Sequence, residues 1–210
     1  ISRIVKWYSV FRPALAHPSA MFRRKALSYG LRYDENLQTA QDYDFFSRIQ
    51  QYGNATVIKS PLLLYRSHSD NISNQKKLHQ GICAAQICRN NLLRTFPNFF
   101  SEHGRQAASS IADFIHRETP LSGQKFEKGI ELLARLEKAY LNTVSPKNRI
   151  IKEAIQRFTL RWIIQAVFQK KAASLKIRLK ILYKLRYRLF HLFEESRSYM
   201  NSRMKGRFSF

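Results

Sequence analysis

Acidic residues are scarce in this sequence, and their scarcity dominates its electrostatics. Only 14 Asp and Glu face 37 Lys and Arg among 210 residues, which gives a formal net charge of +23. Such an excess attracts polyanionic partners: nucleic acid, anionic lipid or phosphate-bearing substrates. Between positions 147 and 191 the only acid is Glu153. We therefore expect a strongly basic surface in the C-terminal third of the chain.

Glycine, proline and cysteine are also few. Seven Gly and six Pro are too few for a loop-rich or all-β protein, so long helices are favoured. The two cysteines, Cys83 and Cys88, are five residues apart on an expected helix and point to different sides of it, which favours neither a disulfide nor a zinc site. We expect reduced thiols, as in a reducing compartment.

No signal peptide is recognisable, and the chain begins at Ile1 in apolar sequence. The longest apolar stretch near the tail, over 162–168, is far shorter than the roughly 20 residues that span a bilayer. These features lead us to expect the trailing piece of a longer protein. Its predicted location is the cytoplasm, with peripheral attachment at the inner face of the plasma membrane as an option.

The first 75 residues alternate short apolar runs with turn-like clusters. They predict an extended piece over 18–22, a short helix over 23–29, and a helix over 41–52 that Thr39 can cap and Gly53 ends. Residues 55–58 and 62–66 predict strands, the second buried on both faces.

Only helical patterns follow position 74. Pro97, Pro120 and Pro146 separate the expected helices, as helix boundaries should. In the last helix a leucine stripe and a lysine stripe occupy different faces, which is typical of a basic amphipathic helix. The expected helices span 74–95, 99–117, 124–142, 147–170 and 172–200.

Four sequence pieces in the first 75 residues stand in a suggestive order: HPSAMFRR (17–24), GLRYDE (30–35), TAQDYDFFSR (39–48) and LYRSH (64–68). Together they resemble the second half of the catalytic domain of family-two glycosyltransferases, which invert the anomeric carbon and have the GT-A fold. The resemblance implies an α/β fold, a partial GT-A type catalytic domain, over 1–75. A helical region over 76–145 would pack on it, and a strongly basic all-α tail over 146–210 would follow.

The resemblance also assigns roles to residues. An inverting transferase needs a base that removes the proton of the acceptor hydroxyl, and by resemblance this base is Asp42. The family has Glu immediately before it, where this chain has Gln41. Neighbours of the acceptor or donor would be Gln41, Arg66, His17 and Arg23.

A divalent metal, Mg²⁺ or Mn²⁺, is implied because the departing diphosphate develops negative charge. His68 resembles the histidine that reaches toward this metal. The family's principal ligands form an Asp-x-Asp motif, and none precedes position 15, so the main ligands would lie outside this chain. We expect the chain alone to be inactive, because the sugar-nucleotide-binding half is missing.

A structural interpretation of the same residues stays open. Thr39 and Asp42 also have the spacing of an ordinary capping box, in which Asp42 folds back on the Thr39 amide. Taken singly, His68 is typical of a loop histidine and Arg23 of a solvated helix start. The ordered combination favours the transferase.

The predicted partners are a nucleotide-sugar donor and a saccharide or lipid-linked acceptor, as in synthesis of cell-surface polysaccharide or lipopolysaccharide. The basic stretch over 147–191 can bind an anionic membrane, where each Lys or Arg contributes on the order of 1 kcal/mol. Nucleic acid is disfavoured, because the chain has no helix-turn-helix signature, zinc-ligand spacing or aromatic-basic RNA motif. The alternative is a non-catalytic remnant, or a basic helical protein that binds membrane or nucleic acid.

Overall fold

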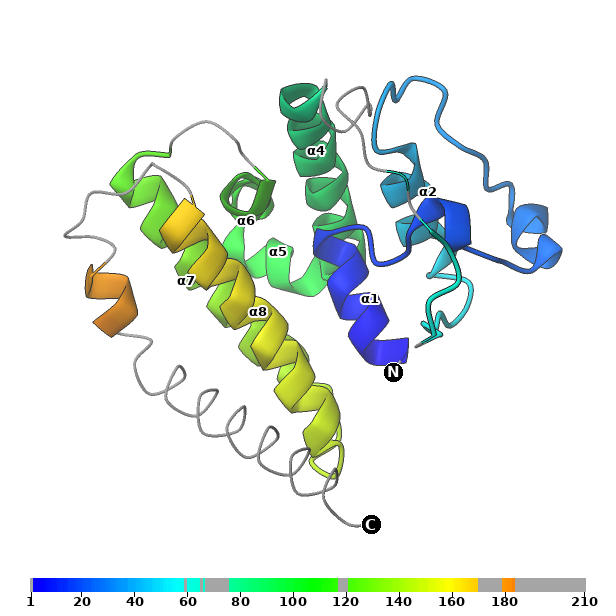
Figure 1. Ribbon diagram of the computed structural model, residues 1–210. Coiled ribbons are helices and arrows are strands. Elements are labelled where there is room, and N and C mark those ends of the chain that lie inside the picture. Colours follow the sequence, from blue (N-terminus) through cyan, green and yellow to red (C-terminus); the bar gives the residue numbers. More distant parts are fainter. Residues whose placement is uncertain are drawn as a thin grey trace, which may run out of the picture.

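The computed structural model describes residues 2–58, 60–64, 66, 76–116, 121–169 and 179–183. Within them the chain is helical (Figure 1). Short 3₁₀ helices span His17–Ser19 and Arg24–Tyr29, and residues 179–183 are helical as well. The α-helices are α1 (Ser2–Phe11), α2 (Gln41–Ile49), α4 (Lys77–Thr95), α5 (Pro97–His103), α6 (Arg105–His116), α7 (Gly123–Asn142) and α8 (Arg149–Gln169).

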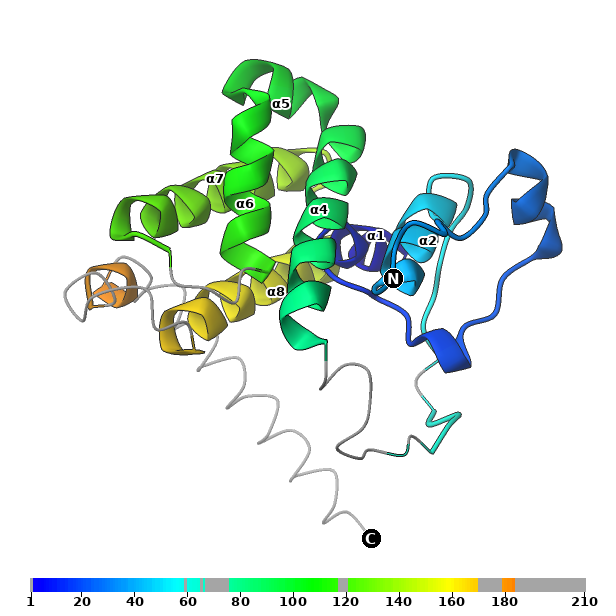
Figure 2. The ribbon, with the colours of Figure 1, turned by 90° about the horizontal axis from the view of Figure 1, so that it is seen from above.

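Five helices pack in a closed circuit around the main core. α1 contacts α4, α4 contacts α6, α6 contacts α7, α7 contacts α8, and α8 returns to α1. α5 is a short connection between α4 and α6, and α2 lies outside the circuit against α1 and α4. Figure 2 shows α2 and the loop before it on one side of α1 and α4, away from α7. The arrangement is a helical bundle with α2 attached to its flank.

Aromatic side chains close the circuit at α1. Trp7 is 1% exposed and stacks on Tyr140 of α7, with ring centroids 4.8 Å apart. Phe11, also fully buried, meets the edge of Trp7 at 4.8 Å and lies 4.9 Å from the ring of Trp162 in α8. Aromatic pairs of this kind contribute about 0.5–1.5 kcal/mol beyond the burial of their surface. They hold a short helix of ten residues in place.

The expected α/β fold is wrong for the described residues, which form no strand. The predicted strand segments lie open to solvent instead: Ile58 is 64% exposed, Leu62 60% and Leu64 99%. An apolar run signals burial, but a strand exists only where a neighbouring backbone accepts its hydrogen bonds. No such neighbour accompanies these segments in the described part of the chain. A partial GT-A sheet is therefore absent there.

The helical predictions succeed more often. The expected helices over 74–95, 124–142 and 147–170 correspond to α4, α7 and α8. The helix expected over 99–117 is divided into α5 and α6 at Gly104, whose φ of 79° no other residue type adopts readily. Gly30 ends its 3₁₀ helix as predicted, with φ 73°. Most of the helix expected over 172–200 lies outside the described residues.

Both cysteines are free, as expected. Cys88 is fully buried in the main core, and this burial raises the pKa of its thiol to about 12. A thiol that stays protonated at neutral pH is a poor nucleophile. Cys88 is therefore a structural residue of the core.

Gly129 marks the closest approach between α6 and α7. A Cβ atom built at this position would lie 2.6 Å from Cβ of Phe114 and 3.1 Å from the backbone oxygen of Ser110. Neither neighbour is the mobile end of a side chain, so a methyl group here must push the two helices apart. Glycine is required by the packing.

We predict that Gly129→Ala lowers the free energy of unfolding by about 1–3 kcal/mol, because over-packing forces the backbones of α6 and α7 to shift. Urea denaturation followed by circular dichroism measures the change. Gly53→Ala is the matched control, since a Cβ there meets no atom within 4 Å. Equal stability of the two variants would show that α6 and α7 are not packed this closely.

Candidate functional site

Three of the four sequence pieces converge on the outer face of α2. Tyr33 stacks on Phe45 at 4.4 Å, and its hydroxyl lies 3.1 Å from Nε2 of His17. Phe22 meets the edge of Phe45 at 5.3 Å. Phe45 and Phe46 are buried with Leu31 in a small second core. Pieces that are separate in the sequence thus form one unit around α2.

Asp42 lies in the first turn of α2 and is half-buried. Its Oδ1 accepts a hydrogen bond from the backbone N–H of Tyr43, at 2.9 Å. Asp44, two residues later, is engaged by Arg48 in a pair at 2.6 Å. No ion pair of the described residues includes Asp42, so its second oxygen is available to another group.

The capping-box interpretation is wrong. The residue before α2 is Ala40, with φ 62°, and no side chain caps the helix. Thr39 is buried, and its hydroxyl lies 3.2 Å from Nδ1 of His79 in α4. Ala40 is the one described non-glycine residue with positive φ, a conformation that costs on the order of 1 kcal/mol. The Thr39 hydroxyl thus links the turn before α2 to α4 and does not cap α2.

The other predicted site residues are dispersed. Gln41 uses its amide nitrogen to donate to the Leu37 carbonyl at 2.7 Å, which anchors the preceding loop. His17 is exposed beside Tyr33, and Arg23 and Arg66 are exposed. None of these side chains is hydrogen-bonded or ion-paired to Asp42. His68 lies outside the described residues.

In the described part of the chain, no three His, Cys, Asp or Glu side chains lie close enough together to bind a metal ion. His79 approaches Sγ of Cys83 at 3.7 Å, but this pair has no third candidate ligand beside it. The predicted main ligands lie outside this chain and His68 lies outside the described residues, so the divalent metal stays a prediction.

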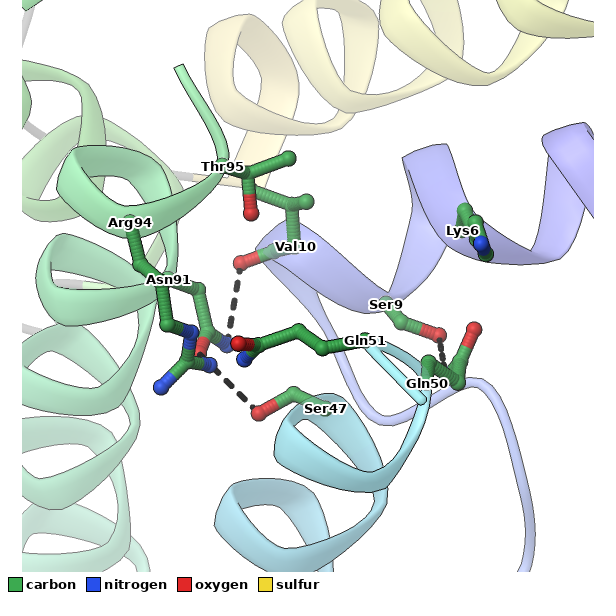
Figure 3. Close-up of a pocket in the computed structure, with 9 residues that line it drawn as sticks. All are labelled: Lys6, Ser9, Val10, Ser47, Gln50, Gln51, Asn91, Arg94 and Thr95. Carbon is green, nitrogen blue, oxygen red and sulfur yellow. Dashed lines mark hydrogen bonds between the residues drawn. The ribbon is translucent and has the colours of Figure 1, made fainter. Parts of the chain in front are cut away.

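A polar network at the junction of α1, α2 and α4 was not predicted. The Ser47 hydroxyl donates to Oδ1 of Asn91 at 3.0 Å, and the Gln50 amide donates to the Ser9 hydroxyl at 2.6 Å (Figure 3). All four side chains are buried. The sequence does indicate that Tyr43, Ser47 and Gln50 share one helix face, because they have the i, i+4, i+7 spacing. The partners on α1 and α4 are too distant in sequence for that spacing to reveal them.

Comparisons with known proteins add no assignment: no protein-family model, no curated protein and no solved structure matches the chain. No helix of the described residues is long and apolar enough to cross a membrane.

Proposed function

We propose that this chain presents the catalytic base of a sugar transferase, with Asp42 as the base. One observation carries the proposal: a half-buried carboxylate without an ionic partner lies in the first turn of α2, the helix around which three of the four sequence pieces converge. The family resemblance assigned the base to this residue. The proposal does not require a sheet within the described residues. It requires a donor-binding part outside them.

The reaction proceeds in one displacement. The acceptor oxygen bonds to the anomeric carbon while the bond from that carbon to the nucleoside diphosphate breaks. The diphosphate leaves with the bonding electron pair, and the acceptor proton passes to Asp42. His17 and Arg23 are exposed on the loop before α2, where they are open to contact with a saccharide or lipid-linked acceptor.

We expect Asp42→Asn to reduce sugar transfer by about 10²–10⁴-fold, because the amide cannot accept the proton. The measurement is release of nucleoside diphosphate from a panel of nucleotide sugars, with saccharide and lipid-linked acceptors, by the complete product of the encoding gene.

Asp44→Asn is the matched control, because the same change two residues along α2 removes a carboxylate that pairs with Arg48 and lies near Arg94, away from the proposed base. Wild-type turnover by Asp42→Asn would overturn the assignment. Sugar transfer by the 210-residue chain alone would refute the need for a separate donor-binding part.

A second candidate function, peripheral binding to anionic membrane, is favoured by the outer face of α8. Ile150 is 80% exposed and Phe168 64% exposed, and the exposed Arg157 and Arg161 lie between them. These four positions are spaced by 7, 4 and 7 residues, which places them on one face over about 27 Å of helix. Apolar side chains among cations suit the boundary between lipid headgroups and acyl chains.

We predict that the chain sediments with vesicles of phosphatidylglycerol and phosphatidylcholine but not with phosphatidylcholine alone, and that added salt weakens the binding. Replacing Ile150 and Phe168 together by Glu should weaken it at least about fivefold, because both the apolar contact and the charge attraction are lost. The control replaces Leu78 and Ile82 of α4, 57% and 62% exposed, by Glu. Equal loss in both double variants would indicate a general charge effect and remove α8 as the binding face.

A further inference from the structure

A cavity of about 170 Å³ lies where α1, α2 and α4 meet (Figure 3). Its size is close to that of a cavity that holds a benzene molecule, so it suits a ligand of roughly 6–10 non-hydrogen atoms. Three lining residues, Gln51, Arg94 and Thr95, are exposed and form a rim through which a ligand can enter. The remaining lining residues are Lys6, Ser9, Val10, Ser47, Gln50 and Asn91.

The lining carries two positive charges and no negative one. Lys6 and Arg94 supply the charges, and no ion pair of the described residues includes either side chain. Neutral amides hold Arg94 instead: its Nη2 donates to Oδ1 of Asn91 at 2.5 Å, and the Gln51 carboxamide can accept from it when its oxygen faces the guanidinium. Burial of the guanidinium lowers the pKa of Arg94.

Gln50, one of the lining residues, carries a hydrogen-bond acceptor without a partner. Gln50 is 6% exposed, and its amide nitrogen donates to the Ser9 hydroxyl and to the Phe46 carbonyl. Its oxygen, Oε1, is buried without a hydrogen-bond partner. A buried acceptor without a donor costs about 1–3 kcal/mol, and a ligand that supplies the donor recovers this energy. Cavity, cations and acceptor all come from the same three helices.

We propose that this cavity binds a small oxyanion, phosphate or carboxylate, carried on a hydroxylated molecule. The oxyanion pairs with Lys6 and Arg94, whose guanidinium presents a fork of donors that matches either group. A ligand hydroxyl donates to Oε1 of Gln50. The proposal is independent of sugar transfer and of Asp42, since it depends on the opposite end of α2.

Isothermal titration calorimetry of the full chain with glycerol 3-phosphate, glycerate and glycerol tests this proposal. A background of 0.15 M KCl suppresses general attraction to a chain of charge +23. We expect saturable binding at one site for glycerol 3-phosphate, glycerate or both, and none for glycerol. The first two probes distinguish a phosphate site from a carboxylate site.

Variants then locate the site. Arg94→Met and Lys6→Met should each weaken binding at least about tenfold, because each removes a charged hydrogen bond. Gln50→Leu should weaken binding of glycerol 3-phosphate, because the acceptor for a ligand hydroxyl is lost. Arg161 is an exposed cation of α8 outside the cavity, so Arg161→Met is the control. It should leave the binding of glycerol 3-phosphate within twofold of wild type.

Thermal unfolding of each variant shows whether it folds, and Lys6→Met and Arg94→Met provide two separate chances to test the charge requirement. Absence of saturable binding by the wild-type chain would overturn the proposal. So would binding that both of these variants leave within twofold of wild type, since the anion would then lie on the general basic surface.

Discussion

The buried hydroxyl of Tyr43 makes a short hydrogen bond between α2 and the end of α1. Tyr43 is 2% exposed, and its phenolic oxygen donates to the backbone carbonyl of Val10 at 2.7 Å. Val10 lies in the last turn of α1, where carbonyl groups have no partner within the helix. The bond therefore gives this carbonyl its closer donor, and it fixes α2 against α1 at the same time.

Side chains from several helices form hydrogen bonds to the last carbonyl groups of α1. The Asn91 amide of α4 reaches the same Val10 carbonyl at 3.5 Å, and the His116 ring of α6 contacts the Phe11 carbonyl. Burial raises the pKa of Tyr43 well above 10, so its hydroxyl keeps the proton that it donates. Because α2 is attached in this way, its first turn presents Asp42 and its last turn closes the polar cavity. The sites proposed at the two ends of α2 thus share the contact between α1 and α2.

The sequence predicts the helices better than it predicts what surrounds them. Proline spacing and apolar periodicity gave α4, α7 and α8, because both signals are local. The helix expected over 41–52 rests on equally local signals, and the structure has it as Gln41–Ile49. The strands expected over 55–58 and 62–66 fail because an apolar run does not specify a partner backbone. The Thr39 cap fails because Ala40 adopts a left-handed conformation and Thr39 contacts His79, forty residues away.

The same distinction applies to the candidate sites. The position of Asp42 at the start of a helix follows from local pattern. The cavity does not, since Lys6, Gln50 and Arg94 come from three distant segments.

The most direct test of the α1–α2 contact is urea denaturation of Tyr43→Phe, with exposed Tyr52→Phe as the control. We expect Tyr43→Phe to lower the free energy of unfolding by about 1–3 kcal/mol, because the Val10 carbonyl loses its close donor. Tyr52→Phe should lower it by less than about 0.5 kcal/mol. Equal stability of the two variants would contradict this expectation.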